Sequence, residues 1–364
     1  MAKEFRLSRV FILTDELNPV SPTGESLRFK SKLEEAGVCV KLVHCSDSDF
    51  RTPDTFHIKA KRAGRFSLDA LRVIRDQLRG FGASQLVCLG SRAIEAGPWV
   101  GAGLGIHLTA IHSELDSLCH GFLNWRQRVA LSRFDLHITR RTEDAEQLRS
   151  RFPNWAIETY PWTRADQSVR SAAAEIKQQL NIPQHAKLVG TVSDLRPGCR
   201  VKDFVWGGDL MRCIRDDVYW LVMGTGTQEW RLKRFTRQLD VRENVQFLGL
   251  PIHAAQIVAS LDVYVQPSTQ DQNCVGLGFA AQHGIPLVGI IHPMHRPFIR
   301  HGVNGFLVER GARNEISRCV NRIVNEPEIA QRFSNQSRSL ADALLTDCKD
   351  FDRLFDLRSR IAAA

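Results

Sequence analysis

The sequence predicts an α/β protein built from two doubly wound parallel sheets that face each other across a cleft. Short apolar runs of strand length alternate with amphipathic segments of helix length. This alternation occurs twice, on either side of a looser polar stretch at 160–169. A chain of 364 residues is also long enough for two domains with separate cores.

The first half begins with RVFILT at 9–14, an apolar run typical of a buried strand. Gly37 ends the helical spacing that precedes the next apolar run, VCVKLV. We expect strands at 9–14, 38–43 and 85–89 and helices at 26–36 and 68–78. Strands separated by helices imply right-handed crossovers and a parallel sheet.

The second half repeats the pattern with more regular spacing. We expect strands at 187–192, 219–223, 245–248, 263–266 and 286–291, and helices at 201–215, 228–239, 254–260 and 275–283. Ligands of such sheets bind beyond the carboxyl ends of the strands. The predicted domains are therefore residues 1–165 and 166–330, followed by a tail of amphipathic helices at 331–364 that packs back on the first domain.

Composition narrows the class of protein. The nine cysteines are spread singly without CxxC spacing, which favours reduced thiols over a disulfide framework or a zinc site. Prolines and glycines interrupt the two long uncharged runs at 96–113 and 272–295, so we predict no membrane span and a cytoplasmic protein. The net charge of +9 suits anionic ligands, although solvated helix faces also explain it.

Seven short motifs follow one another in the second half. They are VG at 189–190, RVKDF at 200–204, VMGTG at 222–226, QFLG at 246–249, LDVYVQPS at 261–268, GIPLV at 284–288 and HGVNGFLV at 301–308. In this order and spacing, the region resembles the donor-binding half of the retaining glycosyltransferases of family 4. The first half resembles the family more loosely, through TAIH at 109–112 and FDLHI at 134–138.

The resemblance implies the GT-B fold, with two Rossmann-like domains and the donor site in the second. It implies transfer of a hexose from a nucleotide sugar to an unknown acceptor, with retention of configuration and no cofactor or metal. The acceptor is a sugar, a lipid-linked molecule or another small molecule. Peripheral contact with a membrane is left open, because Phe122, Trp125, Arg126 and Arg128 form an aromatic and basic stretch, although packing of the aromatic rings in the core also explains it. Nucleic acid is not expected as a partner, since only the charge suggests it.

Several residues become candidates through this resemblance. His112 and Asp271 are the candidate catalytic residues, His112 at the end of a strand and Asp271 at the first of two acidic positions that flank a helix. The candidate donor-binding residues are Arg196, Arg200, Lys202, Gly224, Gly226, Ser268, Asn273, His295 and Arg296. Cations and a helix N-terminus suit a diphosphate, and glycines permit close approach of a backbone, whether by a ligand or in a packing turn. For His112, a purely structural role is the alternative.

Three positions depart from the family pattern. Phe279 stands where the family has a glutamate that grips the ribose, and Asp194 and Cys199 stand where it has an arginine and a lysine for the diphosphate. A phenyl ring cannot accept a hydrogen bond from a diol. The alternative function is therefore a catalytically inactive relative that acts as a binding or partner module. A nicotinamide dehydrogenase is a weaker alternative, because no GxGxxG followed by an acid is present.

Overall fold

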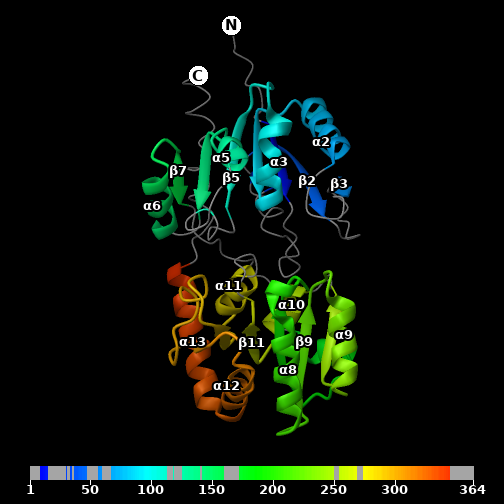
Figure 1. The fold of residues 1–364 in the computed structure, drawn as a ribbon. Helices are drawn as coiled ribbons and strands as arrows, with labels where there is room; N and C mark the ends of the chain where they lie inside the picture. The colour runs from blue at the N-terminus through cyan, green and yellow to red at the C-terminus, as the bar shows by residue number, and fades with distance from the viewer. Residues whose placement is uncertain are drawn as a thin grey trace. The chain divides into compact units, whose positions relative to one another are not determined.

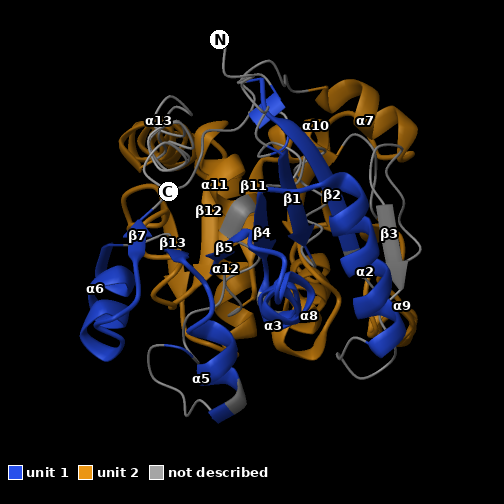
Figure 2. Cartoon of the chain, turned by 90° about the horizontal axis from the view of Figure 1, so that it is seen from above, with its two compact units in different colours: residues 1–17, 23–161, 347–364 blue, residues 18–22, 162–346 orange. Residues whose placement is uncertain are grey.

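A computed structural model describes residues 9–14, 30, 33–34, 37–46, 56–59, 67–112, 118, 125–139, 142–159, 172–249, 254–268 and 274–344 (Figure 1). The chain divides into two compact units, coloured separately in Figure 2. The first comprises residues 1–17, 23–161 and 347–364, and the second residues 18–22 and 162–346. The expected domain boundary near 165 lies outside the described residues.

The first unit contains a parallel sheet of order β3-β2-β1-β4-β5-β6-β7. Its strands are β1 (Arg9–Thr14), β2 (Cys39–Ser46), β3 (Phe56–Lys59), β4 (Gln85–Leu89), β5 (His107–Ile111), β6 (Leu136–Thr139) and β7 (Ile157–Thr159). In β1, Phe11 and Leu13 enter one core cluster while Val10 and Ile12 enter another. Because successive side chains point to opposite faces, this strand is buried on both faces.

Four described helices accompany this sheet: α2 (Leu68–Phe81), α3 (Ser91–Gly101), α5 (Trp125–Leu131) and α6 (Thr142–Arg151). Helix α2 shows how local chemistry sets helix ends. The Ser67 side chain accepts a hydrogen bond from the Ala70 amide, and Gly82 ends the helix in the left-handed conformation. Ala70, Ile74 and Leu78 form its buried stripe.

The second unit contains a parallel sheet of order β10-β9-β8-β11-β12-β13. Its strands are β8 (Lys187–Val192), β9 (Val218–Met223), β10 (Val245–Gly249), β11 (Val263–Gln266), β12 (Leu287–Ile290) and β13 (Gly305–Val308). Its helices are α7 (Ala173–Gln179), α8 (Val201–Arg212), α9 (Glu229–Gln238), α10 (Ala254–Ala259), α11 (Cys274–Gln282), α12 (Arg313–Asn325) and α13 (Pro327–Leu344), and a short 3-10 turn covers Pro197–Cys199.

Two hydrophobic clusters lie on opposite faces of this second sheet. One includes Phe204 of α8, Leu232 of α9 and Val320 of α12. The other includes Ile257 of α10 and Leu277 of α11. Helices thus cover both faces, as expected for a doubly wound sheet.

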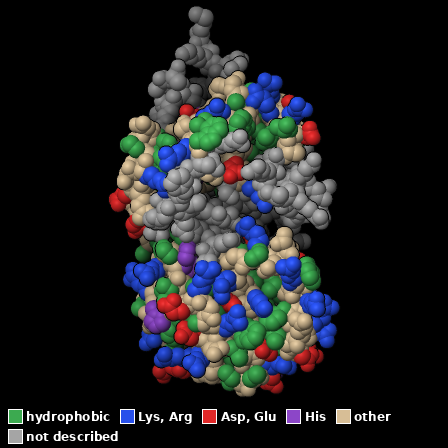
Figure 3. Space-filling view, viewed as in Figure 1, with side chains coloured by type: hydrophobic (Ala, Val, Ile, Leu, Met, Phe, Trp, Pro, Cys, Tyr) green, Lys and Arg blue, Asp and Glu red, His purple; other side chains and the backbone are tan. Residues whose placement is uncertain are grey.

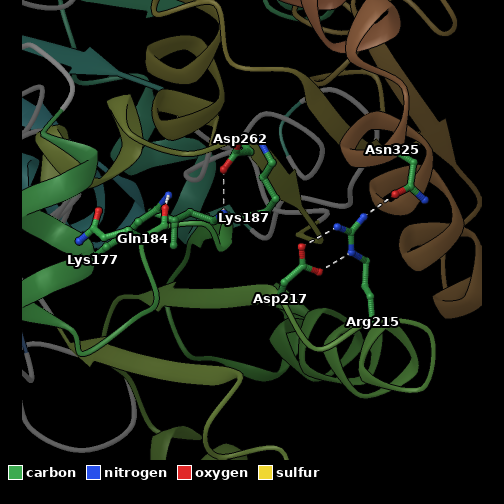
Figure 4. Close-up of polar contacts among 8 residues, drawn as sticks. Lys177, Gln184, Lys187, Arg215, Asp217, Asp262 and Asn325 are labelled. Carbon is green, nitrogen blue, oxygen red and sulfur yellow. Dashed lines mark hydrogen bonds and ion pairs between the residues drawn. The ribbon is translucent and has the colours of Figure 1, made fainter.

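Ion pairs close the amino-terminal edge of the second sheet (Figure 4). Asp262, directly before β11, accepts a hydrogen bond from Lys187 Nζ at 3.0 Å and one from the Leu188 amide at 2.8 Å. Arg215 forms a bidentate pair with Asp217 at 2.5 and 2.6 Å and also contacts Asn325. These hydrogen bonds hold the pKa of Asp217 below its usual value. The charged residues of this edge therefore pair with one another and stabilise the fold.

The C-terminal tail begins with the end of α13, which packs against α11 and α12 of the second unit. For the rest of the tail, the expected packing on the first unit stays a prediction. Phe333 of α13 is buried in one core cluster of the second unit and Ala341 in the other, so α13 contributes to both cores of that unit. Residues 345–364 lie outside the described residues.

The predicted two-sheet α/β fold is confirmed, and most predicted elements agree with the structure to within a few residues. The strands at 9–14, 85–89, 187–192 and 263–266 have their predicted bounds. The helix predicted at 201–215 ends at Arg212, and the helix predicted at 26–36 falls mostly outside the described residues.

Candidate functional site

Two loops interlock at the carboxyl-terminal edge of the second sheet. The loop after β8 donates amide hydrogen bonds from Ser193 to Met223 at 3.0 Å and from Leu195 to Thr225 at 3.0 Å. In return, the Gln228 amide donates to the Leu195 carbonyl at 2.8 Å. The backbones of the two loops therefore lie in direct contact.

Gly224 and Gly226 allow this contact. A Cβ atom on Gly224, whose φ is +137°, would lie 1.9 Å from the Ser193 carbonyl oxygen. A Cβ atom on Gly226 would lie 2.7 Å from the Leu195 carbonyl oxygen. Both glycines thus serve the approach of two backbone segments, which is the packing-turn alternative left open by the sequence.

A buried carboxylate organises the basic residues that follow. Asp203 of α8 is 3% exposed. Its Oδ2 accepts a hydrogen bond from Arg200 Nε at 2.6 Å and forms an ion pair with Arg200 Nη2 at 2.5 Å, and its Oδ1 accepts a hydrogen bond from Arg313 Nε at 2.8 Å. Arg200 itself has φ of +53° and ends the loop just before α8. We call Arg200, Asp203 and Arg313 the arginine cluster; it holds two cations and one anion.

The other two basic candidates lie on either side of Arg200 in the sequence. Arg196 Nη2 donates to Asp194 Oδ2 at 2.7 Å, with both side chains partly exposed. Lys202 places its ammonium group 4.5 Å from the ring centroid of Phe235 on α9. Phe235 stacks on Trp206, whose ring lies 5.0 Å from the Arg313 guanidinium carbon. Cations and aromatic rings therefore form one continuous surface around the first turns of α8.

The three positions that depart from the family pattern all have partners inside the protein. Asp194 pairs with Arg196. Cys199 is buried in one hydrophobic cluster, and Phe279 is buried in the other, where its ring stacks on His283 with centroids 4.2 Å apart. Phe279 is thus a core side chain.

Buried polar atoms mark the carboxyl ends of β8, β11 and β12. Thr191 Oγ1, Gln266 Nε2 and His295 Nε2 are enclosed and have no hydrogen-bond partner among the described residues. Gln266 pairs in register with Gly289, and a Cβ atom on Gly289 would lie 3.5 Å from His295 Nδ1. Gln266 and His295 therefore share one face of the sheet, because paired residues of parallel strands point to the same side.

The tautomer of His295 follows from its one hydrogen bond. Its Nδ1 lies 2.7 Å from the Ile290 carbonyl oxygen, which can only accept, so Nδ1 carries the proton and Nε2 is left as an acceptor. Burial lowers the pKa of His295 to about 4. The ring is therefore neutral at neutral pH.

In the first unit, His112 forms a buried pair with His137. Their Nε2 and Nδ1 atoms lie 2.9 Å apart, and the His137 ring stacks on Trp155 with centroids 4.1 Å apart. Burial, together with the neighbouring His137, lowers the pKa of His112 to about 3. Burial lowers the pKa of His137 to about 4. His112 follows β5, at the carboxyl-terminal edge of its sheet.

Of the remaining candidates, Ser268 is fully buried directly after β11 and Arg296 is exposed. Asp271 and Asn273 lie outside the described residues. The structure adds Asp203, Arg313, Gln266 and His137 to the residues singled out from the sequence. Asp203, Gln266 and His137 lie inside quoted motifs, whereas Arg313 is 110 residues from its partner and no local signal pointed to it.

Neither a metal cluster nor a spanning helix occurs in the described part of the chain. There, no group of three or more His, Cys, Asp or Glu side chains is arranged to hold a metal ion. No helix among these residues is both long and apolar enough to cross a membrane.

Known proteins resemble this chain in sequence and in structure. Residues 172–340, most of the second unit, match the family model "Glycosyl transferases group 1". An uncharacterized glycosyltransferase of Haemophilus influenzae is 25% identical over 33% of this chain and 35% of its own length. N-acetyl-alpha-D-glucosaminyl L-malate synthase of Bacillus anthracis is 22% identical over 45% of this chain and 43% of its own length.

Solved structures resemble the chain over nearly its whole length. Sucrose-phosphate synthase from Thermosynechococcus elongatus has a TM-score of 0.72 at 14% identity, covering 98% of this chain and 100% of that one. Anabaena HepE in complex with UDP and glucose has a TM-score of 0.73 at 15% identity, with the same coverage. These structural neighbours are GT-B glycosyltransferases, and the likeness shows the fold.

The family model matches less than half of the chain, and the two curated relatives are only 25% and 22% identical to it over the aligned residues, so membership of this family and a transferase activity are treated as proposals. The alignments with the two curated relatives span less than half of either relative, so the reaction and its substrates are treated below as proposals.

The loop contact at Gly224 predicts a selective loss of stability. Gly224→Ala should lower the free energy of unfolding by about 3 kcal/mol, because the new methyl group meets a carbonyl and the backbone is strained. Gly249→Ala is the control, since Gly249 has φ of +65° but open space around it; it should cost about 1 kcal/mol. Urea denaturation measures both, and equal losses would contradict the contact.

The buried His295 predicts a pH-dependent stability. Its pKa is lowered from 6.5 to about 4, so the unfolded chain binds the proton more tightly and stability falls as the pH drops from about 6.5 towards 4. Between pH 7.5 and 5, this histidine should account for a loss of about 2 kcal/mol.

Urea unfolding of wild type and His295→Gln at both pH values isolates this contribution. The variant should lose less stability than wild type on acidification. His185→Gln, on the exposed surface of the same unit, is the control and should behave like wild type. An identical pH dependence in wild type and His295→Gln would rule out the neutral buried ring.

Proposed function

We propose that the protein transfers a hexose from a nucleotide-sugar donor to an acceptor, with retention of configuration at the anomeric carbon. The observation that carries this proposal is the arginine cluster. It lies after β8, at the start of α8, in the unit that matches the glycosyltransferase family model. The carboxyl edge of a doubly wound sheet is where such folds bind ligands.

The chemistry of sugar transfer explains why cations belong at this edge. As the bond to the leaving diphosphate breaks, negative charge grows on its oxygens and positive charge develops on the sugar ring. Arg200 and Arg313 together outnumber the single Asp203 carboxylate, and Arg196 and Lys202 flank them in the loop and first turn. The twelve-residue helix α8 adds its positive dipole end. We assign these four basic residues to the diphosphate.

We assign the sugar to the polar groups at the ends of β11 and β12. Gln266 Nε2 needs an acceptor and His295 Nε2 needs a donor. A sugar hydroxyl can satisfy both at once, because it donates one hydrogen bond and accepts others. Ser268, Asp271, Asn273 and Arg296 complete the proposed sugar contacts, with Asp271 in the catalytic role that the resemblance implies.

Phe279 changes the expected contact with the ribose. A core phenyl ring offers no acceptor to the two ribose hydroxyls, so other groups must bind the nucleoside. Gly224 and Gly226 act on the donor indirectly, by holding the loop that carries Arg196 and Arg200 in place. The proposed donor site is therefore a modified form of the family pattern.

His112 is proposed to orient the sugar or the acceptor from the first unit. Because its pKa is about 3, it is neutral at physiological pH and can act only as a hydrogen-bonding group. His137 fixes the orientation of its ring through the 2.9 Å contact. His137 is thus a positioning residue for His112.

UDP-sugars are the first donors to test, because HepE has been solved with UDP and glucose and TarM with UDP and alpha-GlcNAc-glycerol. As the resemblance implies, we propose that the protein itself carries no cofactor. The acceptor is a sugar, a lipid-linked molecule or another small molecule, and nucleic acid is not proposed as a partner.

Titration calorimetry with UDP- and GDP-sugars tests the proposed activity. Binding of at least one donor is expected, and an NMR assay of the product should show the same anomeric configuration as in the donor. The substituted position Phe279 is the observation behind the alternative of an inactive binding or partner module, which the matches to glycosyltransferases do not favour. Lack of binding to every donor at millimolar concentration would support that alternative and exclude transfer.

Two substitutions locate the site. Arg200→Ala and Asp271→Asn should each lower kcat/KM more than tenfold, because each removes a charge assigned to the donor. Arg212→Ala, at the opposite end of α8, is the matched control and should keep wild-type turnover. Wild-type rates in both site variants would show that the donor binds elsewhere.

A further inference from the structure

Helices α3 and α5 of the first unit carry large apolar side chains on their exposed surfaces. Trp99 of α3 is 61% exposed, and Trp125 and Val129 of α5 are 70% and 46% exposed. Trp125 and Val129 are four residues apart and Arg133 is four further on, so all three follow one face of the helix and its direct continuation. Single apolar side chains are common on protein surfaces, but several large ones exposed side by side mark an interaction surface.

Arginines surround these side chains. The guanidinium carbon of Arg133 lies 5.9 Å from the ring centroid of Trp99, which joins the α3 and α5 parts of the surface. On the other side, Arg75 of α2 donates to the Trp99 and Val100 carbonyls at 3.3 Å. Arg128 is exposed one turn after Trp125. We call Arg75, Trp99, Trp125, Arg128, Val129 and Arg133 the tryptophan–arginine surface.

The charge of this region is strongly one-sided. Residues 68–81, 91–101 and 125–133 contain seven arginines and only three acidic residues. Figure 3 shows hydrophobic and basic side chains side by side among the described residues of the first unit. A protein face that contacts only water is usually polar. This face carries apolar side chains and arginines, so a partner with an apolar interior and an anionic rim would complement it.

We propose that the tryptophan–arginine surface docks the protein on an anionic lipid bilayer. Tryptophan rings favour the boundary between headgroups and acyl chains, where an apolar ring and a polar N–H are both satisfied. Arginines pair with phosphate groups at the same depth, and their stems lie along apolar surface. This binding site is independent of sugar transfer, which is assigned to the carboxyl edge of the second sheet.

Vesicle co-sedimentation at low ionic strength tests the proposal. Vesicles with equal parts of phosphatidylcholine and phosphatidylglycerol should bind the full-length protein, while vesicles of phosphatidylcholine alone should bind it weakly. Trp99→Ala combined with Trp125→Ala should weaken binding about tenfold, and Arg128→Glu with Arg133→Glu by at least as much. These side chains are exposed, so circular dichroism should show unchanged folding.

Trp230→Ala is the matched control. Trp230 of the second unit is 58% exposed and has the Arg231 guanidinium carbon 5.3 Å from its ring, but it lies outside this surface. Its replacement should leave vesicle binding unchanged. Quenching of tryptophan fluorescence by brominated lipid should fall strongly in the Trp99/Trp125 variant and little in the control.

Three results would overturn the proposal. The first is equal binding to neutral and anionic vesicles, and the second is loss of binding in Trp230→Ala but not in the Trp99/Trp125 variant. The third is absence of vesicle binding, with self-association in analytical ultracentrifugation that the Trp99/Trp125 variant abolishes; this would assign the surface to contact between copies of the chain.

Discussion

The carboxylate of Asp203 is the constraint on which the basic edge of the second unit depends. Arg200 and Arg313 come from segments more than a hundred residues apart, and this one buried anion holds both guanidinium groups. Without it, two cations would repel each other on a partly buried surface. The left-handed backbone of Arg200 and the interlocked loops at Gly224 serve the same end, since they fix where the loop after β8 meets α8.

The amino-terminal edge of the second sheet stabilises the fold, whereas its carboxyl-terminal edge carries the proposed donor site. At the amino edge, Lys187 pairs with Asp262 and Arg215 pairs with Asp217, so charges there are balanced locally. At the carboxyl edge, cations exceed anions in the arginine cluster, and Gln266 and His295 keep hydrogen-bonding atoms that have no partner in the described part of the chain. Such an imbalance costs stability, and ligand sites commonly retain it because the ligand completes the arrangement.

Features set by neighbouring residues could be predicted from the sequence, whereas features set by contacts between distant segments could not. Strands such as β8 and β11 are apolar runs buried on both faces, so their bounds follow from local pattern. The helix predicted at 201–215 was too long, because Cys213 caps α8 and Ile214 lies exposed beyond it. The packing of α13 in the second unit was missed, since an amphipathic helix does not reveal which core receives it.

The same limit applies to the site. Arg200 could be selected from the motif at 200–204 and His295 through the family resemblance, but the bond between Asp203 and Arg313 joins distant segments and is visible only in three dimensions. Gly224 and Gly226 were open to two interpretations, and the close approach of Ser193 and Leu195 favours loop packing. Phe279 departs from the family in sequence, and its burial gives the physical reason why a carboxylate would be costly there.

A crystal structure with a bound UDP- or GDP-sugar tests the central claim most directly. The account predicts that the diphosphate oxygens lie within hydrogen-bonding distance of Arg200 and near Arg313 and the first turn of α8, with a sugar hydroxyl between Gln266 and His295. A donor bound away from this edge, with the arginine cluster facing only solvent, would contradict it.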